Sequence, residues 1–148
     1  MKAISTKLSA LIACFFLYSS QLTIADSEDG FLKAQSYSLE ASAAFMEAAS
    51  EGRMALSDDE AKLAHTKLAE FINAGPSYLK SIYPKGNDQC KKAIDQFLQS
   101  DNLKNLDLLT KRGAKQLKDY LEAMETSASV YEDFYNTATI DCNDTLNF

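Results

Sequence analysis

Two cysteines, Cys90 and Cys142, constrain the fold of this chain more than any other sequence feature. They bracket the stretch with the most regular helical pattern, in which apolar or small residues recur every three or four positions from Leu103 to Ala138. If the two sulfurs are bonded, their Cα atoms must lie within about 7 Å of each other. The chain between them must therefore reverse at a point that gives two arms of similar length.

Gly113 is the position at which we expect this reversal. A turn there gives arms of about 31 and 43 Å, whereas a turn near Ser100 gives arms of about 15 and 58 Å, which a disulfide cannot bridge. The two cations directly before Gly113 are also typical of a helix C-terminus. The alternative is that this glycine is tolerated inside one long helix, at a cost of about 1 kcal/mol.

The arm lengths predict a helical hairpin. Its first helix runs from about Asp88 to Lys111, with a kink at residues 100–102, and its second helix continues to about Ile140. A disulfide between the cysteines would close the open end of the hairpin. It would add about 4 kcal/mol, because closing a loop of about fifty residues lowers the conformational entropy of the unfolded chain. The alternative is a pair of free, buried thiols.

The first 25 residues predict a secretory signal peptide. A basic start is followed by an apolar run from Leu8 to Tyr18 and by small residues at the −3 and −1 positions of a cleavage site after Ala25. The apolar run is shorter than the stretch of about 20 residues that a transmembrane helix needs. We therefore expect export to a periplasm or out of the cell, where disulfides persist.

Two further helices are expected before Cys90. Residues 31–51 form the first, and their many alanines and serines let another helix approach closely or, alternatively, leave a groove for an apolar ligand. A capping box from Ser57 to Glu60 starts the second, which we expect to end at Gly75-Pro76. Residues 77–83 then form two helical turns or pack irregularly.

These elements together predict the fold class. Residues 26–148 are expected to form a single all-α domain, a bundle of about four helices with one disulfide closing the C-terminal hairpin. The length of this segment is enough for one modest hydrophobic core.

Charge narrows the choice of partners. The whole chain has a net charge of −6, and residues 1–25 contain two lysines and no acids, so residues 26–148 have a net charge of −8. An acidic chain argues against nucleic acid as the main partner and suits a basic protein. No second apolar stretch is long enough to span a membrane.

The sequence contains no motif that indicates catalysis, a metal site or a cofactor. Nucleophilic catalysis needs a base, and His65 is the sole histidine and is expected at the surface. The carboxylates of residues 58–60 are explained by the helix cap rather than by a metal. Asn143 begins an N-glycosylation triplet, which matters only in a eukaryotic host.

Three aromatic residues form the candidate partner surface: Tyr131, Phe134 and Tyr135. Tyrosine suits such surfaces because one end is apolar and the other is polar. The alternative is that these rings belong to the core. The sequence thus predicts an exported, non-enzymatic binding module that engages a protein partner, as inhibitors and immunity-type proteins do.

The alternative function is a carrier of a small apolar ligand. Its pocket would be lined by large apolar side chains from both halves of the chain: Phe31, Phe45, Met46, Tyr120 and Met124. An exported helical bundle with a late disulfide superficially resembles the plant pectin methylesterase and invertase inhibitors. This chain lacks their N-terminal hairpin stapled by cysteines, so we infer no membership of that family.

Overall fold

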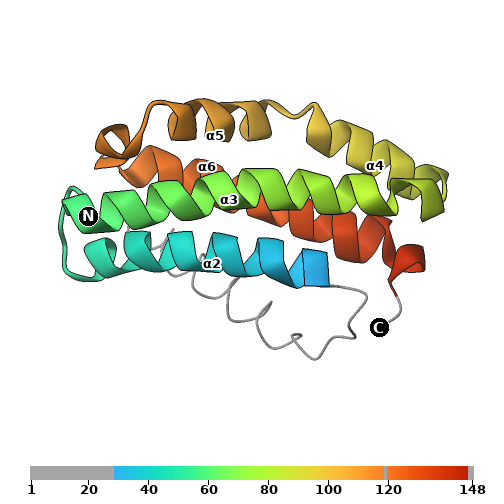
Figure 1. Ribbon diagram of the computed structural model, residues 1–148, viewed down its shortest axis with the longest axis horizontal. Coiled ribbons are helices and arrows are strands. Elements are labelled where there is room, and N and C mark those ends of the chain that lie inside the picture. The colour runs from blue at the N-terminus through green and yellow to red at the C-terminus, as the bar shows by residue number, and fades with distance from the viewer. Residues whose placement is uncertain (1–28, 119, 147–148) are drawn as a thin grey trace.

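The computed structural model describes residues 29–118 and 120–146. The predicted signal peptide, residues 1–25, lies outside these ranges and stays a prediction. The α-helices are α2 (Asp29–Ser50), α3 (Asp58–Ile82), α4 (Asp88–Leu98), α5 (Asp101–Lys111) and α6 (Tyr120–Asn136) (Figure 1). Short helical turns lie between or after them: η2 (Tyr83–Lys85), η3 (Ala114–Lys118), η4 (Thr137–Asp141) and η5 (Asn143–Thr145).

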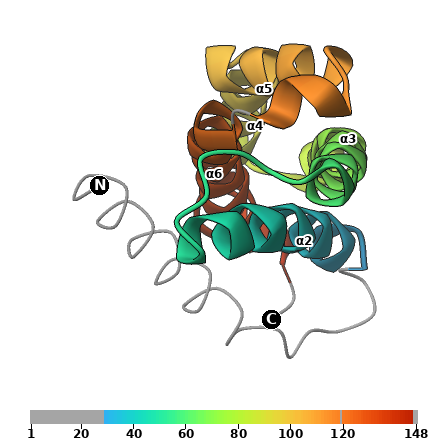
Figure 2. The same ribbon diagram turned by 90° about the vertical axis from the view of Figure 1, so that its left-hand side faces the viewer.

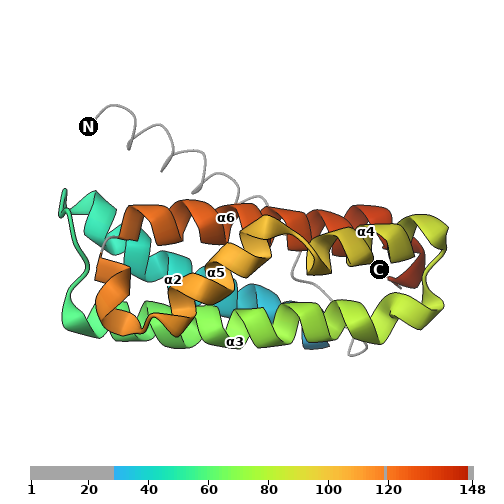
Figure 3. The same ribbon diagram turned by 90° about the horizontal axis from the view of Figure 1, so that it is seen from above.

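The helices form an antiparallel bundle with four positions. Seen from its end, α2, α3 and α6 occupy three positions, and α4 and α5 share the fourth (Figure 2). From above, α5 crosses obliquely toward α3, while α4 lies beside the C-terminal part of α6 (Figure 3). The all-α bundle of about four helices predicted from the sequence is confirmed.

The hairpin reverses where the arm lengths predicted. Gly113 has a φ of 92°, a left-handed conformation that glycine adopts without strain, so the alternative of one unbroken helix is wrong. The predicted kink is a complete break, because α4 ends at Leu98 and Ser100 caps α5. The Ser100 hydroxyl accepts a hydrogen bond from the amide of Leu103 at 3.2 Å.

The disulfide closes the hairpin as predicted. Cys90 and Cys142 are bonded, their Cα atoms are 4.5 Å apart, and both side chains are fully buried. A π-helical turn, in which the Cys142 amide donates to the carbonyl of Thr137 at 2.9 Å, precedes the second cysteine. Gly86 packs against the bond so closely that an added Cβ would lie 2.5 Å from the sulfur of Cys90.

Helix α3 is longer than the sequence predicted. The capping box between Ser57 and Glu60 is present, but the helix does not end at Gly75-Pro76 and continues to Ile82. Pro76 removes one backbone hydrogen bond. Burial of Tyr78 and the rest of the last two turns on the core side of α3 favours continuation, since leaving the helix would expose that apolar surface.

A cluster of aromatic rings fills the core at the disulfide end. Phe134 is fully buried, and its ring centroid lies 5.6–6.2 Å from those of Phe31, Phe71, Tyr78 and Phe97. These rings come from α2, α3, α4 and α6. One side chain therefore joins all four positions of the bundle.

The predicted partner surface is wrong in its residues. Tyr131, Phe134 and Tyr135 are 2%, 0% and 7% exposed, so they belong to the core. Helix α6 packs against α2 and α5, and its C-terminal turn η4 packs against α4. Because other helices lie on several sides of α6, they bury a wider stripe of its surface than one packing face would.

The predicted ligand-pocket residues do not converge on a cavity either. Phe31 belongs to the cluster around Phe134, whereas Phe45 lies fourteen residues further along α2, about 21 Å away, and stacks on Tyr120 at 6.5 Å. Met124 is buried and Met46 is half-buried. None of the clefts described is lined by these residues, and the carrier pocket stays a prediction.

No helix in the described part of the chain is long and apolar enough to cross a membrane.

Candidate functional site

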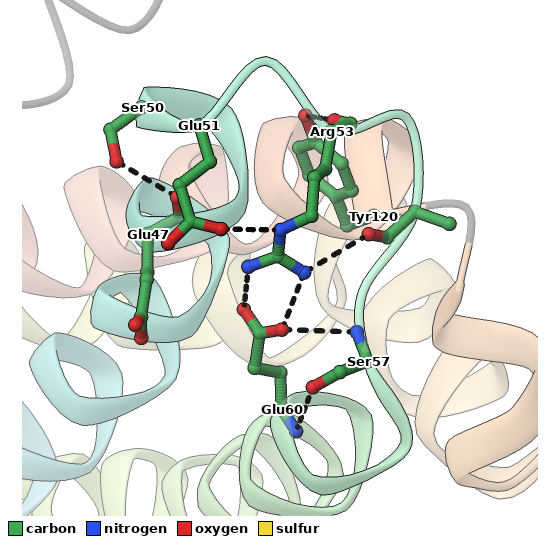
Figure 4. Close-up of polar contacts among 8 residues, drawn as sticks. Glu47, Ser50, Glu51, Arg53, Ser57, Glu60 and Tyr120 are labelled. Carbon is green, nitrogen blue, oxygen red and sulfur yellow. Dashed lines mark hydrogen bonds and ion pairs between the residues drawn. The ribbon is translucent and has the colours of Figure 1, made fainter.

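A network of polar contacts surrounds Arg53, in the loop between α2 and α3 (Figure 4). Its guanidinium donates two hydrogen bonds to the carboxylate of Glu60, at 2.6 and 2.8 Å, and a third to Glu51 at 2.7 Å. The Glu60 carboxylate also accepts from the amide of Ser57 at 3.0 Å, which completes the capping box. The network therefore ties the loop to the start of α3.

Electrostatics and backbone contacts give this network a structural role. Hydrogen bonds from Arg53 lower the pKa of Glu60 to about 2. The carboxylates of Glu60 and Glu51 in turn raise the pKa of Arg53. The Arg53 carbonyl accepts a hydrogen bond from the hydroxyl of Tyr120 at 2.8 Å, which joins the loop to α6. Because its side-chain nitrogens already face carboxylates, Arg53 is poorly placed to bind another anion.

His65 also has a structural partner. Its Nε2–H donates to the carbonyl of Thr110 at 2.8 Å and links α3 to α5. The adjoining cleft has a volume of about 280 Å³, and the ion pair between Asp107 and Lys111, at 2.7 Å, borders it. This histidine is half-buried and explained by the helix contact, close to the surface position that the sequence predicted.

A second cleft of about 280 Å³, between α4 and the end of α6, is acidic. Asp133 and Asp141 line it, and partial burial raises the pKa of Asp133. Asp141 accepts a hydrogen bond from the side chain of Gln89 at 3.1 Å. Within residues 29–118 and 120–146, no three potential metal ligands form a group that could hold an ion.

A groove of about 670 Å³, larger than the two clefts above, lies between α2 and α3, and we call it the α2–α3 groove. Residues from α2, from one stripe of α3 and from η2 line it: Gly30, Lys33, Tyr37, Glu70, Asn73, Ala74, Ser77, Tyr78, Ser81, Ile82 and Lys85. The stripe recurs every three or four residues over Glu70–Ile82 and is about 18 Å long. The groove therefore follows the seam between two antiparallel helices.

Small residues create the groove and rigid aromatic residues bound it. Gly30 meets Tyr78 so closely that an added Cβ would lie 3.1 Å from that ring. The Tyr78 ring is buried and packs against the rings of Phe31 and Phe134, at centroid distances of 5.8 and 6.2 Å. It supplies a fixed apolar floor, while the small side chains beside it leave space above.

The two ends of the α2–α3 groove differ in charge. Near Tyr37, the Glu70 carboxylate is paired with Lys67 at 3.1 Å, and Lys67 also pairs with Glu40 at 2.9 Å. Toward the other end, Lys33 and Lys85 make no ion pair with any residue between 29 and 146 whose side chain is described. The groove therefore carries available positive charge on a chain whose net charge is negative.

Polar side chains add hydrogen-bonding capacity. In the described part of the chain, Asn73 and Ser77 make no side-chain hydrogen bond, so an amide and a hydroxyl are available to a ligand. The Ser81 hydroxyl donates to the carbonyl of Tyr78 at 2.6 Å and keeps its lone pairs as acceptors. The arrangement suits binding of a polar chain along an apolar floor.

Sequence reasoning did not find this groove. Its signal was the polar stripe of Asn73, Ser77 and Ser81 at helical spacing, which becomes visible only if α3 continues past Pro76. If the helix ended at Pro76, as the sequence predicted, Ser77 and Ser81 would not share a helix face with Asn73. The groove also needs the pairing of α2 with α3, which periodicity within one helix does not provide.

The chain matches no protein-family model, no curated protein and no solved structure. The function must therefore be argued from the groove and from the compartment that the disulfide suits.

Proposed function

We propose that this protein is an exported, non-enzymatic binding module that engages a protein partner through the α2–α3 groove. The observation that carries the proposal is the groove itself. It combines about 670 Å³ of surface hollow, a fixed tyrosine floor and polar side chains that are not used within the described fold. Inhibitors and immunity-type proteins are the classes of binding module that we favour.

Export is supported by two features. The sequence begins with a predicted signal peptide, and the Cys90–Cys142 bond is a buried structural link of the kind that persists in oxidising compartments. The net charge of −8 over residues 26–148 favours attraction to a partner that is basic as a whole. Such long-range attraction speeds encounter, while the groove would determine where contact is made.

Filling the groove tests the proposal. Ser77 is an exposed serine in the groove, and Ser129 is an exposed serine on α6 outside the pockets described. We expect a partner purified from the native compartment with the tagged wild-type chain to be retained by Ser129→Trp and lost by Ser77→Trp. Circular dichroism would verify that both variants keep the helical content of the wild type.

Two results would contradict the proposal. A partner that Ser77→Trp retains as well as Ser129→Trp does must bind elsewhere on the bundle. A small apolar molecule that co-purifies with the wild-type chain and is displaced by Ser77→Trp, without any protein partner, would instead favour the carrier function.

A further inference from the structure

The α2–α3 groove also carries information about the chemistry of its occupant. We propose that it binds an extended acidic segment of a protein partner, about five or six residues long, and this inference rests on the proposed function. The partner can be basic overall and still present such a segment. Three properties of the groove support the assignment: its length, its charge and its hydrogen-bonding groups.

Length selects an extended chain. The stripe Glu70–Ile82 spans about 18 Å along α3. An extended peptide advances about 3.3 Å per residue, so five or six residues fill this length. A segment of this kind must satisfy its own backbone amides and carbonyls. Asn73 supplies both donors and an acceptor for them, and Ser77 and Ser81 supply hydroxyl oxygens.

Charge selects carboxylates. Lys33 and Lys85 line the groove without an ion pair in the described part of the chain, whereas the carboxylate of Glu70, toward the other end, is paired with Lys67. An aspartate or glutamate at the lysine end gains attraction, and a lysine or arginine there is repelled. The apolar floor of Tyr78 and Ile82 favours an aromatic or aliphatic side chain beside that acid.

The disulfide holds the lysine end in place. Lys85 directly precedes Gly86, and Gly86 packs against the sulfur of Cys90. Lys85 therefore extends from backbone that lies one residue from a contact with the buried disulfide. The proposed site therefore couples the covalent link of the bundle to recognition.

A random hexapeptide library, displayed between flexible flanks, tests this inference on the disulfide-bonded chain. We expect selected peptides to contain Asp or Glu beside an aromatic or aliphatic residue. We expect their affinity to fall roughly tenfold in Lys33→Glu/Lys85→Glu, because attraction is replaced by repulsion. The matched control, Lys92→Glu/Lys104→Glu, makes the same change in net charge outside the groove and should bind within about twofold of the wild type.

The outcomes separate this inference from the proposed function. Selected peptides that lose binding to Ser77→Trp and yet contain no acidic residue would overturn the acidic assignment and leave the groove as the binding surface. Peptides that lose binding to Ser77→Trp and yet bind Lys33→Glu/Lys85→Glu as well as they bind the wild type would do the same. An equal loss in the two double variants would also overturn it, since net charge alone would then explain binding. Selected peptides that bind Ser77→Trp as tightly as the wild type would count against both proposals.

Discussion

The two ends of the bundle are joined by different kinds of interaction. At one end the Cys90–Cys142 bond is fully buried beside a cluster of aromatic rings around Phe134. At the other end a loop is joined to α3 and α6 through the polar contacts of Arg53, which is partly exposed. Reducing the disulfide or truncating a buried ring should therefore lower stability at the first end. At the second end, stability should depend on pH. The α2–α3 groove runs between the two ends. Lys33 and Lys85, which pair with no acidic side chain that the structure describes, lie toward its covalent end.

The largest expected effect is at the aromatic cluster. Phe134→Ala should lower the free energy of unfolding by about 4–5 kcal/mol, because the side chain is fully buried and touches rings from three other helices. Urea denaturation followed by circular dichroism measures this loss. Met54→Ala, which truncates a side chain that is 72% exposed, is the control and should change stability by less than about 0.5 kcal/mol. Similar losses in the two variants would contradict the assignment of the core.

The disulfide should contribute slightly less. Cys90→Ala/Cys142→Ala is expected to lower the free energy of unfolding by about 4 kcal/mol, because the bond joins residues 52 positions apart and so lowers the conformational entropy of the unfolded chain. Adding a reductant should bring the wild type to the level of the double variant and leave the variant unchanged. A loss below about 1 kcal/mol would mean that packing alone closes this end of the hairpin.

Two glycines near the covalent end should give effects of opposite sign. Gly86→Ala places a methyl group against the sulfur of Cys90 and should destabilise by about 2 kcal/mol. Gly75→Ala places one at ordinary contact distance, 3.5 Å from the ring of Phe71, inside a helix, and should stabilise by up to about 1 kcal/mol. Thermal denaturation of both variants distinguishes the two signs. A shared sign would contradict the packing described around the disulfide.

The smallest effect, at the polar end, should depend on pH. The pKa of Glu60 falls from its usual 4.5 to about 2 in the folded protein. A lowered pKa means that the pairing stabilises the fold fully above pH 4.5, and that this stabilisation is lost as the pH falls toward 2. The difference in stability between wild type and Glu60→Gln should therefore shrink over that range. The difference caused by Cys90→Ala/Cys142→Ala should stay constant, and a parallel decline in both would contradict the comparison of the two ends.

The hairpin was predictable because its geometry is strongly constrained. The spacing of Cys90 and Cys142 left Gly113 as the turn that gives similar arms, and the turn and the bond are both present. The capping box at Ser57 was equally clear, because it depends on residues three positions apart. Such features are local, or are fixed by one covalent link.

The rest depended on contacts that a single sequence does not specify. Helical periodicity placed Tyr131 and Tyr135 on the apolar face of α6, but it did not show that other helices cover that face on several sides. Pro76 is a reliable helix breaker when the next turns are exposed, and here one side of those turns, with Tyr78, Leu79 and Ile82, is buried. The α2–α3 groove could be predicted only from both the length of α3 and its packing against α2, and the sequence pattern gave neither.

Photo-crosslinking shows directly whether the α2–α3 groove holds the protein partner. A photoreactive p-benzoylphenylalanine replaces Tyr37, an aromatic residue that already lines the α2–α3 groove, and is compared with the same group at position 129 on α6, in cells that make the protein. We predict a single covalent adduct from position 37 that Ser77→Trp abolishes and Lys33→Glu/Lys85→Glu strongly weakens. An adduct formed equally from both positions, or from position 129 alone, would show that the binding surface is not this groove.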